Sequence, residues 1–222
     1  MKCWAKNVSE CCDTQSREHY ISKGLFSGKK LNVEGFPFLN GEKKEISKAS
    51  LTKKCLCSKH NSLLSPFDSE SIKFGKALEY AHNLSLKRRN SPDKSFSLHR
   101  QIVNAELFSR WVMKTYIGML DFFPVESAIQ VDELANMIFS NKSVRKYVDY
   151  KISMNQGDDF QIAETVGVAP LLRDDRIFGL AVDIYGINIH TLFHKAPVAT
   201  SKLPKIRFCE DPQGLSCLVS LK

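Results

Sequence analysis

Apolar residues recur with the period of a helix in the middle of the chain. Ile72, Phe74 and Leu78 belong to a repeat that continues over residues 68–89. Asp68 or Ser69 can cap its first turn, because a short oxygen-bearing side chain accepts hydrogen bonds from the free backbone N–H groups there. We therefore expect a helix over residues 68–89.

A polar linker follows this helix. Residues 90–93 read Asn-Ser-Pro-Asp, which favours a turn and interrupts helical structure. A change of composition at such a linker is typical of a domain boundary. We place the boundary here, with one domain over residues 1–90 and a larger one over residues 91–222.

The second domain combines helical and strand patterns. An apolar helix is expected over residues 98–123, where Pro124 stops it, and another over residues 131–147. Alternating apolar residues predict a hairpin around Tyr185-Gly186. The expected strands are residues 177–184, residues 187–193, and two short ones near Ile206 and Leu218. The predicted fold class is therefore α+β.

Residues 1–57 lack a comparable apolar pattern. Turn signals around Gly35-Phe36-Pro37 and at Asn40-Gly41 separate short strand-like runs. A segment of this kind cannot build a large core of its own. It normally needs a crosslink, and bound metal is one that its residues offer.

The cysteines are concentrated in that segment. Five of the seven lie before residue 58. We find no run of 18 uncharged apolar residues and no apolar block of a signal peptide, so we expect a cytoplasmic protein with no membrane partner. Thiols stay reduced in that compartment, which favours metal binding over disulfides.

Positive charge is concentrated in the first half of the chain. The formal net charge is +8, with 19 Lys and Arg against 10 Asp and Glu in residues 1–101, and 13 against 14 in residues 102–222. Lysines spread over a solvated surface would produce the same total. Charge gathered in one half also suits a polyanion, and nucleic acid is the commonest such partner.

A zinc site can be assembled from the cysteine-rich segment. The spacing Cys57-x2-His60 is that of a zinc knuckle, in which a tight turn directs two side chains at one ion. The other two ligands should be Cys3 with Cys12, or Cys3 with Cys11 in its place. Cys55 is then a spare thiol. Unconnected cytosolic thiols are the alternative interpretation.

Two ordered motifs around these ligands resemble HNH nucleases. The stretch Glu18-His19-Tyr20-Ile21-Ser22-Lys23 is similar to the opening strand of that family, and Cys57-Ser58-Lys59-His60-Asn61 is similar to its knuckle with His as the second ligand. The resemblance covers about residues 3–70 and extends to uncharacterised bacterial HNH-like proteins. It implies a treble-clef-like ββα-metal unit stapled by structural zinc.

The resemblance implies a role for each matched residue. Glu18 and Asn61 would hold a catalytic divalent ion, Mg²⁺ or Mn²⁺, and His19 would remove a proton from the attacking water. The residues expected to contact the phosphodiester backbone are Arg17, Lys23 and Lys59. The expected function is metal-dependent hydrolysis of nucleic acid, DNA rather than RNA, in phage defence or a mobile element. Residues 91–222 would then serve homodimerisation or docking to another protein.

Three departures from the family pattern keep a second function open. Lys6 stands where the first knuckle has its second Cys, and Asn61 stands where the strongest nucleases of the family have a third His. Residues 50–52 contain no counterpart of the middle Asn. The alternative is a catalytically inactive, zinc-stapled module that binds nucleic acid or protein.

Overall fold

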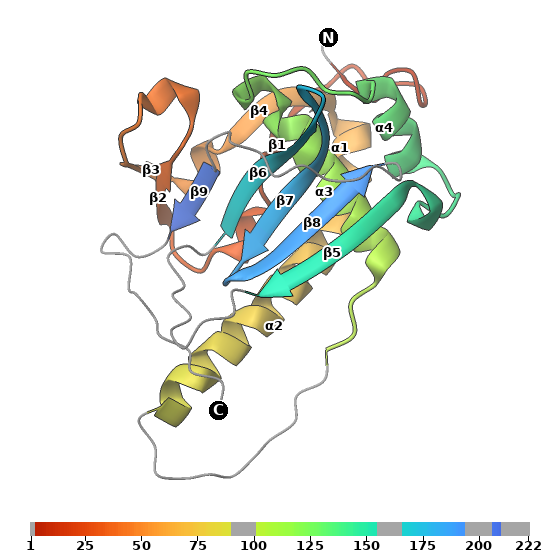
Figure 1. Ribbon diagram of the computed structural model, residues 1–222. Helices are drawn as coiled ribbons and strands as arrows, with labels where there is room; N and C mark the ends of the chain where they lie inside the picture. Colours follow the sequence, from red (N-terminus) through yellow and green to blue (C-terminus); the bar gives the residue numbers. More distant parts are fainter. Residues whose placement is uncertain (1–2, 90–100, 155–165, 194–205, 210–222) are drawn as a thin grey trace.

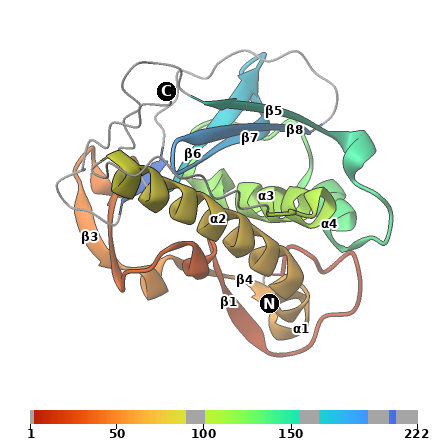
Figure 2. The same cartoon turned by 90° about the horizontal axis from the view of Figure 1, so that it is seen from below.

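Helix α3 (Ala105–Met119) lies at the centre of the structure. In the computed structural model it runs between a large β-sheet and a small pair of strands (Figure 2). Its side chains from Trp111 to Ile117 are all buried. A helix that is apolar on most of its circumference has to be covered on most sides, and this position covers it. The structure describes residues 3–89, 101–154, 166–193 and 206–209.

The large sheet has seven strands in the order β3-β2-β9-β6-β7-β8-β5, and all paired neighbours are antiparallel (Figure 1). Tyr116 attaches α3 to this sheet. Its hydroxyl donates to the Ile177 carbonyl at 3.0 Å, and its ring lies edge-on to Phe193 at 5.0 Å. The strands are β2 (Lys30–Glu34), β3 (Lys44–Ser47), β5 (Val148–Met154), β6 (Val166–Arg173), β7 (Arg176–Ile184), β8 (Ile187–Phe193) and β9 (Ile206–Cys209).

The hairpin expected around Tyr185-Gly186 is confirmed as β7 and β8. Both turn residues have positive φ, 48° and 79°, as a two-residue turn between antiparallel strands requires. The Asp183 carboxylate accepts from the Gly186 N–H at 2.9 Å and holds the turn.

A two-stranded sheet forms on the other side of α3. Its strands pair antiparallel, and β4 leads directly into the helices (Figure 1). The elements of this unit therefore follow one another as strand, strand and helix. An insertion of 32 residues separates the two strands. The elements are β1 (Gln15–His19), β4 (Thr52–Cys57), α1 (Ser58–Ser62) and α2 (Ser65–Arg89).

The two expected domains share one sheet and one hydrophobic core. Strand β2, from the first 90 residues, pairs with β9 from the second part. The buried cluster likewise joins residues such as Leu31 and Val33 to Trp111 and Val182. The described residues form an α+β structure, as expected, while the linker at residues 90–93 lies outside them.

Several helix boundaries differ from the expectations. Helix α2 begins at Ser65, so neither Asp68 nor Ser69 is its cap. Helix α3 begins at Ala105, where the Asn104 side chain accepts from two backbone N–H groups at 3.0 and 3.3 Å, so the described residues before it are not helical. The helix expected over 131–147 ends early as α4 (Val131–Phe139).

The strands of the large sheet also differ in part from the expectations. Strands β5 and β6 were not expected. The residues of β5 alternate between apolar and polar, a signal that was missed, whereas β6 shows no such alternation. The strand near Ile206 is β9, whereas the one near Leu218 lies outside the described residues. No helix in the described ranges is long and apolar enough to span a membrane.

Gly179 of β7 lies where an added side chain would meet the backbone of β8. A Cβ built there would collide with the Thr191 carbonyl oxygen. We expect Gly179→Ala to lower the free energy of unfolding by about 1–3 kcal/mol, because a backbone strand has to move. Urea denaturation followed by circular dichroism measures it. Gly118→Ala is the matched control, since its Cβ would lie 3.7 Å from Tyr20, at ordinary contact distance. Equal effects from both substitutions would contradict this account.

Candidate functional site

Four side chains converge where the N-terminal segment meets the start of α1. One ligand atom from each of Cys3, Cys11, Cys57 and His60 lies within 4.8 Å of the others. The His60 Nδ1 atom is 3.1 Å from the Cys57 sulfur, 3.5 Å from that of Cys3 and 3.8 Å from that of Cys11. Ligands in a tetrahedral zinc site with three thiolates and one imidazole are separated by about 3.5–3.8 Å. The cluster is close enough to bind a metal, and its ligand types are consistent with structural zinc.

Local structure directs the knuckle pair at this point. Cys57 ends β4 and is the N-cap of α1, where its sulfur accepts from the His60 N–H at 3.5 Å. His60 lies three residues further on, so one turn of helix brings both side chains to the same side. The position of Cys3 is fixed by a separate contact, because the N–H of the next residue, Trp4, donates to the Cys55 carbonyl of β4 at 3.1 Å.

A second contact sets the orientation of the His60 ring. Its Nε2 atom is 2.9 Å from the Ser9 hydroxyl. If Nδ1 binds a metal, the ring proton has to be on Nε2, which then donates to Ser9. Histidine ligands of metals commonly have such a partner on the second nitrogen.

The environment favours a thiolate at Cys57. Burial acts to raise its pKa, but hydrogen bonds from backbone N–H groups and from His60 outweigh burial and lower the pKa from 9.0 to about 6. Burial and the neighbouring Cys3 and Cys57 raise the pKa of Cys11. Cys57 thus ionises readily while Cys11 resists, because Cys11 is desolvated and like charges repel. A cation at the centre would remove that resistance.

The structure selects Cys11 over Cys12 as the fourth ligand. Cys12, the first choice from the sequence, points elsewhere, and its sulfur accepts from the Lys59 N–H at 3.3 Å. Adjacent residues cannot both direct their side chains to one point here. Cys55 lies outside the ligand group, as expected, and burial raises its pKa to about 11.

A buried ion-pair cluster occupies the space expected for part of the catalytic ion site. The Lys114 ammonium, with a side chain only 1 % exposed, binds the Glu18 carboxylate and lies 2.8 Å from that of Asp68. Burial alone would lower the pKa of Lys114, but the two carboxylates raise it. Burial raises the pKa of Glu18, whereas Lys114 acts against that shift. An ammonium therefore stands between two carboxylates, and Glu18 is not free to bind a divalent ion.

The other two expected catalytic residues keep free polar atoms. The Asn61 amide nitrogen donates to the Ser16 hydroxyl at 2.9 Å and to the Arg17 carbonyl at 3.4 Å, which directs its Oδ1 atom elsewhere. Among the described residues, neither Asn61 Oδ1 nor His19 Nε2 has a hydrogen-bond partner, although both atoms are buried. Burial, Lys23 and Lys114 lower the pKa of His19. Buried polar atoms without partners are rare, so these two need a ligand or water.

Glu18 does not join them. It directly precedes His19 in β1, and successive side chains of a strand leave opposite faces. Glu18 therefore points toward α3. The structure does not bring the three expected catalytic residues to one point.

The expected phosphate-binding residues lie on the surface around β1 and α1. Arg17 is exposed, and its guanidinium donates to the Thr52 hydroxyl at 3.3 Å. The Lys59 ammonium donates to the Glu10 carbonyl at 3.0 Å, and Lys23 is exposed. All three side chains can therefore reach solvent.

Two important residues were missed in the sequence. Lys114 was overlooked, although it is the only charged residue in the otherwise uncharged run 111–120, and a charge in the middle of a buried helix signals a partner. Ser9 carried no comparable signal, because its contact with His60 depends on the folded loop.

Comparisons with protein-family models, curated protein sequences and solved structures found no significant match to this chain.

The cluster geometry predicts different effects for two adjacent cysteines. We expect Cys11→Ser to lose tightly bound zinc and to unfold at a lower temperature, because a ligand is removed from the staple. Cys12→Ser should keep about one zinc per chain. Elemental analysis after dialysis and thermal denaturation measure both effects. Loss of zinc from Cys12→Ser, with retention in Cys11→Ser, would assign the fourth ligand to Cys12.

Removing the buried ammonium should cost much more than removing an exposed one. Lys114→Met leaves Glu18 and Asp68 facing each other without a counter-charge, so we expect a loss of about 3–5 kcal/mol in unfolding free energy. Lys53→Met is the matched control, since its pair with Asp121 is solvent-exposed and should contribute less than about 1 kcal/mol. Urea denaturation measures the unfolding free energy of both variants. Similar losses of unfolding free energy in the two would refute a structural role for Lys114.

Proposed function

We propose that this chain is a metal-dependent nuclease of the HNH type, which hydrolyses phosphodiester bonds of nucleic acid, DNA rather than RNA. The observation that carries the proposal is a pair of buried atoms on a strand-strand-helix unit, His19 Nε2 and Asn61 Oδ1, which have no hydrogen-bond partner in the described part of the chain. The motif around them resembles that of HNH nucleases, and the same half of the chain holds the excess positive charge.

His19 has the properties of a general base. Its lowered pKa keeps the imidazole neutral at pH 7, and a neutral imidazole can accept a proton from water. The unpartnered Nε2 atom is the one available for this role.

Asn61 is the residue best placed to hold a catalytic ion. Its Oδ1 atom is a hard oxygen ligand that accepts from no donor among the residues the structure describes, whereas Glu18 is bound to Lys114. A bound Mg²⁺ or Mn²⁺ would stabilise negative charge on the phosphate during hydrolysis. The Asn61 amide is held by Ser16 and Arg17, so its oxygen keeps a fixed direction.

A second function is favoured by the Lys114 ion pair. An ammonium between Glu18 and Asp68 leaves little need for a divalent ion near those carboxylates. The chain would then be a zinc-stapled module that binds nucleic acid without cutting it. The setting proposed for the nuclease is phage defence or a mobile element, with residues 91–222 serving dimerisation or docking.

Plasmid cleavage separates the two functions. Supercoiled plasmid is incubated with the protein and Mg²⁺, Mn²⁺ or Ni²⁺, next to His19→Ala and His190→Ala. We expect the wild type to nick the plasmid and His19→Ala to be at least about 100-fold slower, because a general base is lost. His190 lies on β8 in the large sheet, so His190→Ala should cleave normally.

The remaining outcomes are equally informative. Unchanged cleavage by His19→Ala with unchanged zinc content would rule out His19 as the base. If the wild type does not cut but binds DNA with an affinity that falls steeply with salt, the binding module is correct.

A further inference from the structure

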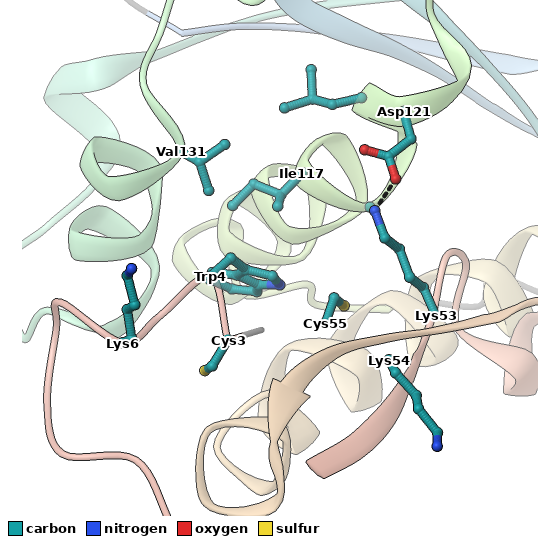
Figure 3. Close-up of a pocket in the computed structure, with 11 residues that line it drawn as sticks. Cys3, Trp4, Lys6, Lys53, Lys54, Cys55, Ile117, Asp121 and Val131 are labelled. Carbon is teal, nitrogen blue, oxygen red and sulfur yellow. Dashed lines mark hydrogen bonds and ion pairs between the residues drawn. The ribbon is translucent and has the colours of Figure 1, made fainter. Parts of the chain in front are cut away.

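A pocket of about 380 Å³ lies on the face of β4 that is turned toward α3 (Figure 3). The N-terminal segment, β4, the end of α3 and the start of α4 all contribute to its lining. Its volume falls within the range of about 300–1,000 Å³ that is usual for small-molecule sites.

The walls of the pocket are mainly apolar and include one indole. Trp4 lies at its centre, close to Ile117 of α3, and Val131 of α4 forms another side (Figure 3). The Trp4 ring packs against Phe139 with centroids 5.6 Å apart, and its backbone N–H is held by Cys55. The indole is therefore fixed before any ligand arrives. A flat aromatic group is the ligand part that such a wall accommodates best.

Two lysines stand on opposite sides of Trp4. Lys6 lies on one side and Lys53 on the other, where Lys53 forms an ion pair with Asp121 (Figure 3). Lys6 is exposed, so its ammonium can move toward a ligand. The pocket thus combines an apolar interior with a net positive rim, which suits an anionic group attached to a flat one.

We infer that this pocket binds a nucleotide, with the base beside Trp4 and the phosphate at Lys6. The ligand can be a free mononucleotide or the terminal nucleotide of a nucleic-acid strand, since both present the same chemistry. Asp121 supplies a carboxylate at the rim that can accept a hydrogen bond from a base amino group.

The site differs from the one proposed for cleavage. Lys53 and Cys55 share the face of β4 that lines the pocket, whereas Thr52, the cross-strand partner of His19, belongs to the opposite face. Nucleotide binding therefore requires neither His19 nor metal-dependent cleavage. A binding assay without divalent ions tests it separately from the nuclease.

Titration of the zinc-loaded, full-length protein with adenosine monophosphate gives the direct test. Trp4 and Trp111 are the two tryptophans, and Trp111 is fully buried, so quenching of tryptophan fluorescence reports on the pocket. We expect saturable quenching with Kd below about 1 mM, confirmed by calorimetry. Adenosine lacks the phosphate and inorganic phosphate lacks the base, so each should bind at least about tenfold more weakly than adenosine monophosphate.

Variants locate the ligand. Val131→Phe narrows the pocket without changing charge and should weaken binding at least about tenfold, while Lys6→Ala should weaken it about fivefold. Lys43→Ala is the matched control, because Lys43 is an exposed lysine that does not line the pocket and its loss should have less than a twofold effect. Zinc content and circular dichroism establish that each variant is folded.

Oligonucleotides distinguish the two sources of the nucleotide. Tighter binding of a 5′-phosphorylated oligonucleotide than of its 5′-hydroxyl counterpart or of the mononucleotide assigns the site to strand ends, and equal or weaker binding assigns it to free nucleotides. Absence of quenching by any of these ligands up to about 10 mM would overturn the inference. Binding that Val131→Phe and Lys6→Ala leave unchanged would overturn it too, because the ligand would then lie elsewhere.

Discussion

The convergence of Cys3, Cys11, Cys57 and His60 is the constraint on which the N-terminal part of the structure depends. Residues 3–14 contain turns but no helix or strand, so backbone pairing alone cannot hold them. The cluster ties them to the point where β4 becomes α1, and this fixes the start of the strand-strand-helix unit. It also fixes Trp4, the neighbour of Cys3, and with it one wall of the pocket. Both proposed sites therefore depend on the position of this cluster.

The buried Lys114 connects this unit to the rest of the molecule. Its ammonium joins β1 through Glu18 and α2 through Asp68, while its helix packs against the large sheet through Tyr116. Nearby, the Trp111 indole donates to the Ser22 hydroxyl at 2.8 Å. The net contribution of such a buried pair to stability is small, because the cost of desolvating its charges is high, whereas removing one partner is strongly destabilising. The same ion pair weighs against a catalytic ion at Glu18. It is the reason for proposing a module that binds nucleic acid without cutting it as the second function.

Features of the structure that depend on residues close together in the chain could be predicted from the sequence. The β7–β8 hairpin and the Cys57-x2-His60 knuckle follow from spacing within a few residues. The choice of Cys11 over Cys12 could not be predicted, because it depends on how a loop without regular structure lies against a helix. The role of Asp68 was predicted wrongly for a related reason: its partner, Lys114, is 46 residues away in the chain. Pairing between β2 and β9 is even more distant and leaves no signal in either strand alone.

X-ray absorption spectroscopy at the zinc edge tests the central claim most directly, because it counts the ligand atoms around the metal. The account predicts about one zinc per chain, surrounded by three sulfur atoms at about 2.3 Å and one nitrogen at about 2.0–2.1 Å. Purified protein that holds no zinc, or zinc bound mainly by nitrogen and oxygen, would contradict the assignment of Cys3, Cys11, Cys57 and His60 as the metal staple.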